Sequence, residues 1–303
     1  MTSTRSSRQP FRLLLVAWTI GSLVATATGA SAQSQERGLY VSVVDHSGAP
    51  VTDLATREFV VKEDGVAREV LRSAPATDPL QIALIVDNSQ AASTDIPDLR
   101  DALRAFIAAL AGTNDMAIIA TADRPTILVD YTTRPADLEK GIGRIFSQPG
   151  SGAYLLESII EVSRGIQKRD AQRPVVLIVT TEGPEFSDLH YDYVLNALEK
   201  SGAAMHAVVL TNPDADISSD RARTRSIVLN RGTESTGGRQ EHVLTSQSLA
   251  ATLKEIAAEI SNQYRIVYSR PETLIPPKKT EVGVTRPTLT ARGTPVRTAA
   301  EGR

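Results

Sequence analysis

Apolar residues alternate with polar ones in the first part of the chain and then gather into continuous runs. The alternation in "GLYVSVVD" (38–45) and "REFVVKEDGVAREVL" (57–71) is typical of strands with one buried face. The second stretch predicts a hairpin that turns at Glu63-Asp64-Gly65. We therefore predict a small N-terminal β unit over 38–72, followed by a linker at 72–79, where "RSAPATDP" is polar and contains proline.

From Leu80 onward, fully apolar strands alternate with helices. "LQIALIVD" (80–87) is a continuous apolar run, as expected of a strand buried on both faces. Further strands are predicted at 115–121, 126–131, 173–181, 203–210 and 263–269, and helices at 96–110, 135–145, 154–167, 189–200 and 249–261. Residues 220–226 fit either a surface helix or a loop. This alternation predicts an α/β domain over 80–263, with a doubly wound, mainly parallel sheet covered by helices on both faces. The strands at 115–121 and 126–131 have no helix between them, so we expect an antiparallel pair at the sheet edge.

The segment after this domain returns to short strand-like patterns. "TEVGVT" (280–285) and "PTLTAR" (287–292) are candidate strands, and we expect residues 264–290 to pack with the N-terminal β unit. The end of the chain, 291–303, is rich in small and polar residues and is predicted to be disordered.

The N-terminus has the pattern of a secretory signal peptide over residues 1–32. Arg5, Arg8 and Arg12 precede or begin a mostly apolar stretch, and Ala30-Ser31-Ala32 resembles a cleavage site. A retained membrane anchor is the alternative. Cleavage would remove three arginines and no acid, which takes the net charge from −2 to −5. We therefore expect an exported protein, periplasmic or secreted, with no stable membrane span after cleavage.

Composition and residue spacing argue against several classes of function. The net charge of −2 offers no basic field for nucleic acid, and the absence of cysteine excludes disulfides and thiolate metal sites. The four histidines (His46, His190, His206 and His242) are dispersed, and no nucleophile motif accompanies them. His206 lies in an apolar strand and is expected to be a satisfied core residue or a half-buried one rather than a ligand. We therefore predict that the protein is not an enzyme.

Polar residues gather in three loops, each of which follows a predicted strand or leads into a predicted helix. They lie in Asp87-Asn88-Ser89-Gln90-Ala91, in "QPGSGAYLLES" (148–158) and in "VTTEGPE" (179–185). In open α/β sheets, ligands bind beyond the carboxyl ends of the strands, so these three loops are expected to converge. Carboxylate and hydroxyl oxygens of this kind are the ligands that hard cations take.

The order of these elements resembles a von Willebrand factor A domain. The resemblance rests on the Asp-x-Ser signature after "IALIV", the glycine-bearing loop before a helix, and "LIVTTEG". The flanks "VSVVDHSGAPVTDLATREFVVKEDG" and "EISNQYRIVYSRP", with "ESTGGRQEHV", resemble exported bacterial proteins of the acidobacterial von Willebrand factor A-related type. The resemblance covers about residues 38–290 and implies a Rossmann-like fold and a metal-ion-dependent adhesion site.

The resemblance places that adhesion site on residues that match it only in part. Asp87 and Ser89 occupy the first two positions of the family's Asp-x-Ser-x-Ser loop, whereas the third falls on Ala91. The family's threonine falls on Ala153 and its aspartate on Glu182. We therefore expect a degenerate site that binds Mg²⁺ or Mn²⁺ weakly or not at all. Alternatively, Asp87 and Ser89 only cap the loop that follows the strand.

These observations predict a binding module that recognises a protein partner through the loops at the carboxyl end of the sheet. The candidate contact residues, besides those of the degenerate site, are Asn88, Gln90, Ser151, Tyr154 and Thr181. One alternative is a structural envelope scaffold that binds through the β unit and has a dead metal site. A hydrolase that uses Asp87 or Glu182 as an acid–base group is a third hypothesis, for which no neighbouring residue provides support.

Overall fold

The computed structural model describes residues 1–3, 34–272 and 274–296. Most of the predicted signal peptide, 1–32, lies outside the described residues, so its fate stays a prediction. All described helices and strands belong to the unit formed by residues 33–303. Within the described ranges, no helix is both long and apolar enough to cross a membrane.

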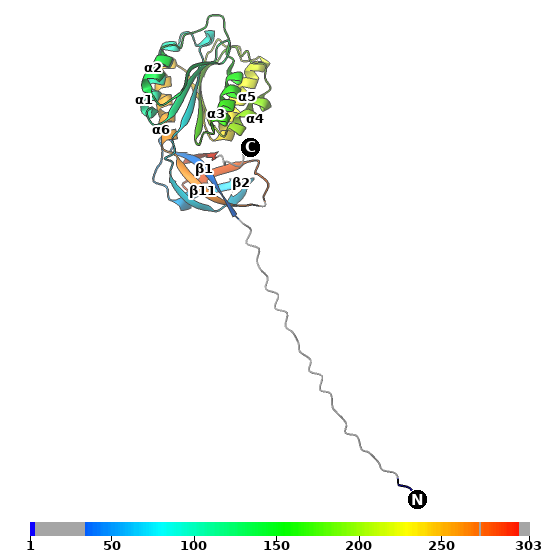
Figure 1. Ribbon diagram of the computed structural model, residues 1–303. Helices are drawn as coiled ribbons and strands as arrows, with labels where there is room; N and C mark the ends of the chain where they lie inside the picture. The colour runs from blue at the N-terminus through cyan, green and yellow to red at the C-terminus, as the bar shows by residue number, and fades with distance from the viewer. Residues whose placement is uncertain (4–33, 273, 297–303) are drawn as a thin grey trace. The chain divides into compact units, whose positions relative to one another are not determined.

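A six-stranded sheet forms the centre of the larger domain (Figure 1), in the order β10-β9-β8-β5-β6-β7. Its strands are β5 (Gln81–Val86), β6 (Asp115–Ala120), β7 (Thr126–Thr132), β8 (Pro174–Thr181), β9 (Ala204–Leu210) and β10 (Gln240–Val243). Every neighbouring pair is parallel except β6 and β7, which pair antiparallel at one edge. The predicted fold class and the antiparallel edge are both confirmed.

Helices cover both faces of this sheet, and the alternation within β5 shows why. Ile82, Leu84 and Val86 pack on one side, while Ala83 and Ile85 pack on the other. The first side is covered by α1 (Ile96–Leu110), α2 (Pro135–Ile142) and α6 (Leu249–Ser261), and the second by α3 (Leu155–Arg169), α4 (Tyr191–Ser201) and α5 (Asp220–Thr236). His206 of β9 is completely buried in the core, but neither of its ring nitrogens has a hydrogen-bond partner within the described residues, so the predicted satisfaction is absent.

Helix α5 is much longer than its sequence pattern suggested. Its composition is polar, and few apolar residues repeat at helical spacing, so only 220–226 was a candidate for a helix. The helix begins at a serine cap, because the Ser219 hydroxyl oxygen accepts from the Ala222 N–H at 3.2 Å. It ends at Gly237, whose φ of 78° is readily adopted by glycine.

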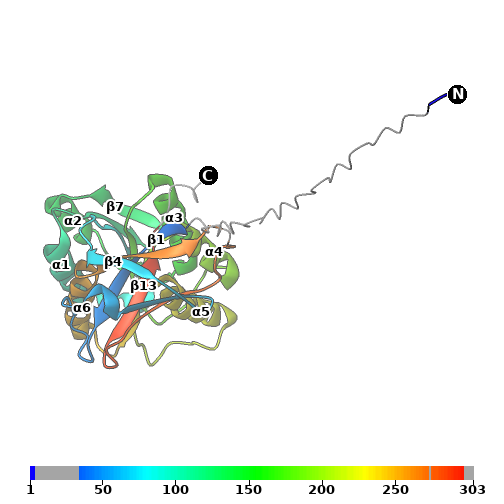
Figure 2. The same ribbon diagram turned by 90° about the horizontal axis from the view of Figure 1, so that it is seen from below.

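Two smaller sheets pack face to face and form a β-sandwich from both ends of the described chain (Figure 2). One sheet has the order β13-β1-β11-β4 and the other β12-β2-β3. The strands are β1 (Ser34–Val44), β2 (Phe59–Glu63), β3 (Val66–Arg68), β4 (Val70–Pro75), β11 (Tyr264–Pro271), β12 (Thr280–Val284) and β13 (Thr290–Pro295). The predicted hairpin at Glu63-Asp64-Gly65 joins β2 to β3.

Two boundary predictions were wrong in this sandwich. The predicted linker at 72–79 begins inside β4, because Arg72 and Ala74 pair with β11. The predicted disordered tail, 291–303, begins inside β13, which pairs with β1 along its length. The strand residues that were mispredicted, 72–75 and 291–295, include no large apolar side chain, and their hydrogen-bond partners lie far away in sequence. Residues 297–303 lie outside the described residues.

Arg173 joins the sandwich to the amino-terminal edge of the central sheet. Its guanidinium is buried and donates to the carbonyls of Asp78 at 3.1 Å and Ile260 at 2.5 Å, and to Gln263 Oε1 at 2.9 Å. Burial lowers the pKa of Arg173 from its usual value. One side chain therefore holds together three segments that are distant in sequence.

Replacing Arg173 by methionine is expected to lower the free energy of unfolding by about 2–4 kcal/mol, because it leaves buried acceptors without donors. Urea denaturation would measure the change. Arg265→Met is the control, since Arg265 is half exposed and only pairs with Asp78 at the surface. If Arg173→Met lowers the free energy of unfolding no more than Arg265→Met does, the result would contradict the role of Arg173 in joining these segments.

Candidate functional site

Backbone hydrogen bonds bring the three predicted loops together at the carboxyl end of the sheet. The Gln90 N–H donates to the Ser151 carbonyl at 3.3 Å, which joins the first loop to the second. The Ala153 N–H donates to the Pro184 carbonyl at 2.9 Å, which joins the second to the third. The predicted convergence is therefore present, although it is built largely from main-chain bonds.

Asp87 lies at the end of β5 and points into this network. It is only 2% exposed. Its Oδ1 accepts from the Ser89 N–H at 2.9 Å, and its Oδ2 accepts from the Thr180 hydroxyl at 2.9 Å and the Thr181 N–H at 3.1 Å. The carboxylate thus binds three internal donors, which matches the capping interpretation of this residue.

The other positions of the family's cation site do not complete it. Ala91 fills the space beside the third loop, since a Cβ added at Gly183 would lie 2.5 Å from the Ala91 Cβ. Ala153 is buried and forms backbone bridges to the neighbouring loops. The carboxylate of Glu182 turns to the loop after β9, where its Oε2 accepts from the Asn212 N–H at 3.1 Å.

The residues at this site therefore do not fit the family's divalent cation. Two positions lack a ligand atom, the Asp87 oxygens already accept hydrogen bonds, and Glu182 is tied to another loop. No cluster of three or more histidine, aspartate or glutamate side chains suited to a metal is found in the described part of the chain.

The predicted contact residues divide into buried and accessible ones. Asn88 is buried, and its side chain accepts from the Ala122 N–H at 2.9 Å and donates to the Phe146 carbonyl at 3.0 Å. Ser151 and Thr181 are also buried in the loop network. Gln90 is exposed, and Tyr154 is half-buried against Phe186, with ring centroids 6.0 Å apart.

Four exposed apolar side chains near these loops were not predicted. They are Phe146 (61% exposed), Phe186 (39%), Ile217 (63%) and Leu244 (81%). Each lies in a loop on the carboxyl-end side of the sheet, and we call them, with Gln90 and Tyr154, the loop face. The only signal in the sequence was an isolated large apolar residue inside an otherwise polar loop.

Glu185 is a fifth residue that sequence reasoning missed. It is 3% exposed, its Oε1 accepts from the Ser187 N–H at 3.1 Å, and its Oε2 has no partner among the described residues. Burial raises the pKa of Glu185 to about 7, and the nearby Glu157 raises it further, against the opposing effects of Ser187 and Arg225. The site therefore contains a buried carboxyl that titrates near neutral pH.

Comparisons with known proteins agree with this architecture. Residues 82–184 match the family model of the von Willebrand factor type A domain. No curated protein sequence matches the chain significantly. A solved von Willebrand factor type A structure from Catenulispora acidiphila is similar, with 10% identity, a TM-score of 0.52, and coverage of 87% of this chain and 74% of that one.

Two further solved structures are similar over part of this chain. The proximal thread matrix protein 1 of the mussel byssus is 13% identical, with a TM-score of 0.49 over 69% of this chain and 50% of its own. An aerotolerance-related membrane protein from Bacteroides fragilis is 14% identical, with a TM-score of 0.46 over 60% of this chain and 98% of its own. We conclude that this chain contains a von Willebrand factor type A domain, which the family model matches over residues 82–184 and which the fold of the six-stranded sheet and its helices supports.

Proposed function

We propose that the chain is an exported binding module that recognises a partner protein through the loop face, without a bound divalent cation. The observation that carries this proposal is the exposure of Phe146, Phe186, Ile217 and Leu244 at the carboxyl end of the sheet. Exposed apolar side chains that gather on one face of a soluble domain mark interaction surfaces. Aromatic residues in particular are enriched among the contacts that dominate protein interfaces.

The packing beneath two of these residues supports a preformed surface. Phe186 stacks edge-on against Tyr154, and a Cβ added at Gly152 would meet the Phe186 ring at 2.7 Å. Phe146 lies under the Arg100 guanidinium, 4.6 Å from the ring centroid. Such side chains lose little conformational freedom when a partner covers them, so less free energy opposes binding.

Recognition without a cation follows from the arrangement of Asp87 and Glu182. In the family's adhesion site the cation takes its last ligand from an acidic residue of the partner. The domain must first hold that cation, and for this it needs side-chain oxygens that are not engaged elsewhere. Here Asp87 accepts from three internal donors, and Glu182 is bonded to Asn212. The same bonds argue against a catalytic acid–base role for either residue, since both are engaged in structural contacts.

A photo-crosslinking amino acid placed at Phe186 is expected to give a discrete adduct with a partner protein in cells that produce the chain. The matched control is the same amino acid at Val66, which is exposed on the β-sandwich, away from the loop face. Adducts would be compared with and without EDTA. Equal adducts from the two positions would contradict recognition by the loop face, and loss of the Phe186 adduct in EDTA would contradict its independence of a cation.

A further inference from the structure

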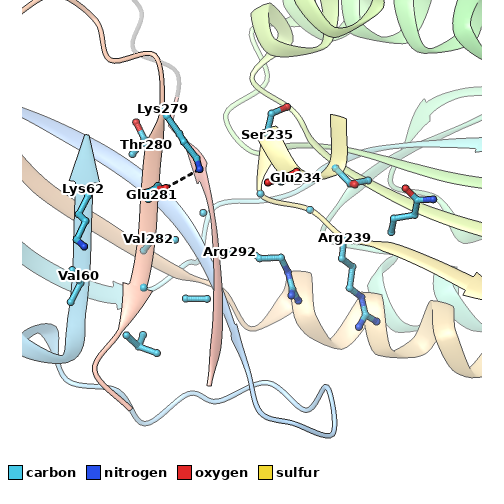
Figure 3. A pocket seen from close by; sticks show the side chains of 18 of the residues that line it. Val60, Lys62, Glu234, Ser235, Arg239, Lys279, Thr280, Glu281, Val282 and Arg292 are labelled. Carbon is cyan, nitrogen blue, oxygen red and sulfur yellow. Dashed lines mark ion pairs between the residues drawn. The ribbon is translucent and has the colours of Figure 1, made fainter. Parts of the chain in front are cut away.

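A groove of about 840 Å³ lies between β12 and the C-terminal end of α5 (Figure 3). Its charged side chains already pair within the chain, since Lys279 meets Glu281 at 2.8 Å and Arg292 meets Glu259 at 2.8 Å. The groove therefore does not select a particular ligand. The buried carboxyl of Glu185 differs, because its Oε2 has no hydrogen-bond partner within the described residues.

Glu185 belongs to the segment 184–187, which carries Phe186 of the loop face. Ala153 ties this segment to the second loop, because its N–H donates to the Pro184 carbonyl at 2.9 Å and its carbonyl accepts from the Phe186 N–H at 2.8 Å. The Phe186 ring lies against Gly152, where an added Cβ would meet it at 2.7 Å. The position of Phe186 on the loop face therefore depends on how the segment 184–187 is held.

Ser187 connects Glu185 to a second carboxyl group, that of Glu157 on α3. The Ser187 N–H donates to Glu185 Oε1 at 3.1 Å, and the Ser187 hydroxyl donates to Glu157 Oε2. A neutral Glu185 adds no charge to this cluster. An ionised Glu185 would place a second negative charge near Glu157 and leave one of its charged oxygens without water, which costs free energy.

The charged groups on neighbouring elements do not neutralise an ionised Glu185. The cation that acts on it is Arg225 of α5, yet this guanidinium donates to two backbone carbonyls of the third loop, at 3.1 and 3.4 Å. The second loop, 148–154, contains no charged residue, and 182–189 adds only the acids Glu182 and Asp188. A charge on Glu185 is therefore stabilised by water only if the segment 184–187 moves.

We propose that Glu185 positions Phe186 through its protonation state, so that the loop face is regulated by pH. The neutral carboxyl keeps the segment 184–187 closed against the second loop and α3, and ionisation releases the segment toward solvent, where the carboxylate gains water. This inference rests on the proposed function of the loop face. The preformed surface around Phe186 is favoured in acidic solution and becomes less populated as the pH approaches 7.

The direction of the effect follows from the proton that the closed segment holds. Burial raises the pKa of Glu185 to about 7 in the closed form, whereas its ordinary value is 4.5. Release of the segment therefore gives up a proton between these two pH values. The equilibrium constant for release rises about tenfold for each pH unit between about 5 and 7, and it levels off above 7, where both forms are ionised.

Amide hydrogen exchange of the full chain between about pH 5 and pH 8, read at single residues by NMR, tests the proposal. After correction for the intrinsic exchange rate, the protection of the Phe186 N–H should fall about a hundredfold between pH 5 and 7, and no further at pH 8. The Gln148 N–H is the matched reporter, since it donates to the Asn88 carbonyl at 2.9 Å on the same face. Its protection should stay within about threefold.

Three variants separate Glu185 from the other acids. Glu185→Gln keeps the neutral form, so the protection of the Phe186 N–H should stay at the value that the parent has at pH 5. Glu157→Gln removes a charge that disfavours ionisation, so the fall should be smaller than in the parent. Glu182→Gln is the matched control and should retain the hundredfold fall, because Glu182 bonds to Asn212 instead.

Protection of the Phe186 N–H that does not change with pH in the parent would overturn the proposal, as would an equal fall at Gln148 or in Glu185→Gln. If Glu185→Gln fails to fold, the carbon-13 shift of the Glu185 carboxyl in the parent continues the test. A titration midpoint below about 5 would then overturn the proposal, because an ordinary glutamate titrates there.

Photo-crosslinking from Phe186 in a cell lysate, buffered at about pH 5.5 and about pH 7.5, distinguishes this inference from the proposed function. We expect at least about twofold fewer adducts at the higher pH in the parent, and no difference in Glu185→Gln. Equal adducts in the parent at both pH values would overturn the regulation and leave the loop face as the binding surface. Adducts no more abundant than those from Val66 at either pH would overturn the loop face itself, and this inference with it.

Discussion

Asp87→Ala is expected to lower the free energy of unfolding by about 3–5 kcal/mol, equally with and without Mg²⁺ or Mn²⁺. The reason is that the variant leaves the Ser89 N–H, the Thr180 hydroxyl and the Thr181 N–H buried without their acceptor. Hydrogen bonds to an ionised group stabilise more than neutral ones, and unsatisfied buried donors carry a full desolvation cost. Denaturant titration with circular dichroism would measure the change.

Ser89→Ala provides the matched control for this experiment. Ser89 would also be a ligand in the family's cation site, yet here it meets Asp87 through its backbone N–H, which alanine retains. We expect its free energy of unfolding to stay within about 1 kcal/mol of the parent. Calorimetric titration with Mg²⁺ and Mn²⁺ should give the same result for the parent and for Asp87→Ala. Destabilisation of Asp87→Ala only in the presence of the cation would contradict the structural role.

Two buried groups, Glu185 and His206, are expected to change stability with pH in opposite directions. Burial raises the pKa of Glu185 to about 7, so the native state retains a proton that the unfolded chain releases above about 4.5. This contribution lowers stability as the pH rises from about 4.5 to 7. Burial lowers the pKa of His206 to about 4, against the nearby Glu259, so the unfolded chain takes up a proton below about 6.5 that the native state does not.

The His206 contribution therefore raises stability as the pH rises from about 4 to 6.5, and the two effects largely cancel in the parent. Each amounts to about 3 kcal/mol, since a tenfold change in a protonation equilibrium is worth about 1.4 kcal/mol. Glu185→Gln imitates the protonated acid. Its free energy of unfolding should match that of the parent near pH 4 and exceed it by about 3 kcal/mol above pH 7.

His206→Leu should behave in the opposite way. The free energy of unfolding of this variant minus that of the parent should be about 3 kcal/mol larger near pH 4 than at pH 7. Neither ring nitrogen of His206 has a hydrogen-bond partner within the described residues, so the apolar replacement breaks no such bond. Urea unfolding at four pH values between 4 and 7.5 would measure both variants. Differences from the parent that do not change with pH would contradict these assignments.

The sequence predicted most of the larger domain because its physical signals are local. The continuous apolar run at 80–87 is buried on both faces, and the helical spacing at 96–110 and 249–261 gives the bounds of α1 and α6. The same patterns did not predict the C-terminal parts of β4 and β13 or most of α5. Strands β4 and β13 pair with strands distant in sequence, and α5 presents a mainly polar surface.

At the loop face, the sequence determined which loops meet and which ligand atoms are missing. The order of strands places Asp87 and Glu182 at one edge of the sheet, and the side chains of Ala91 and Ala153 have no oxygen that could bind a cation. Only the tertiary structure decided the direction of each side chain. Asp87 turns to three donors within the loops, Glu182 turns to Asn212, and Glu185 is buried with one oxygen unpaired. Burial and hydrogen bonding depend on residues distant in sequence, and those contacts exist only after the chain has folded.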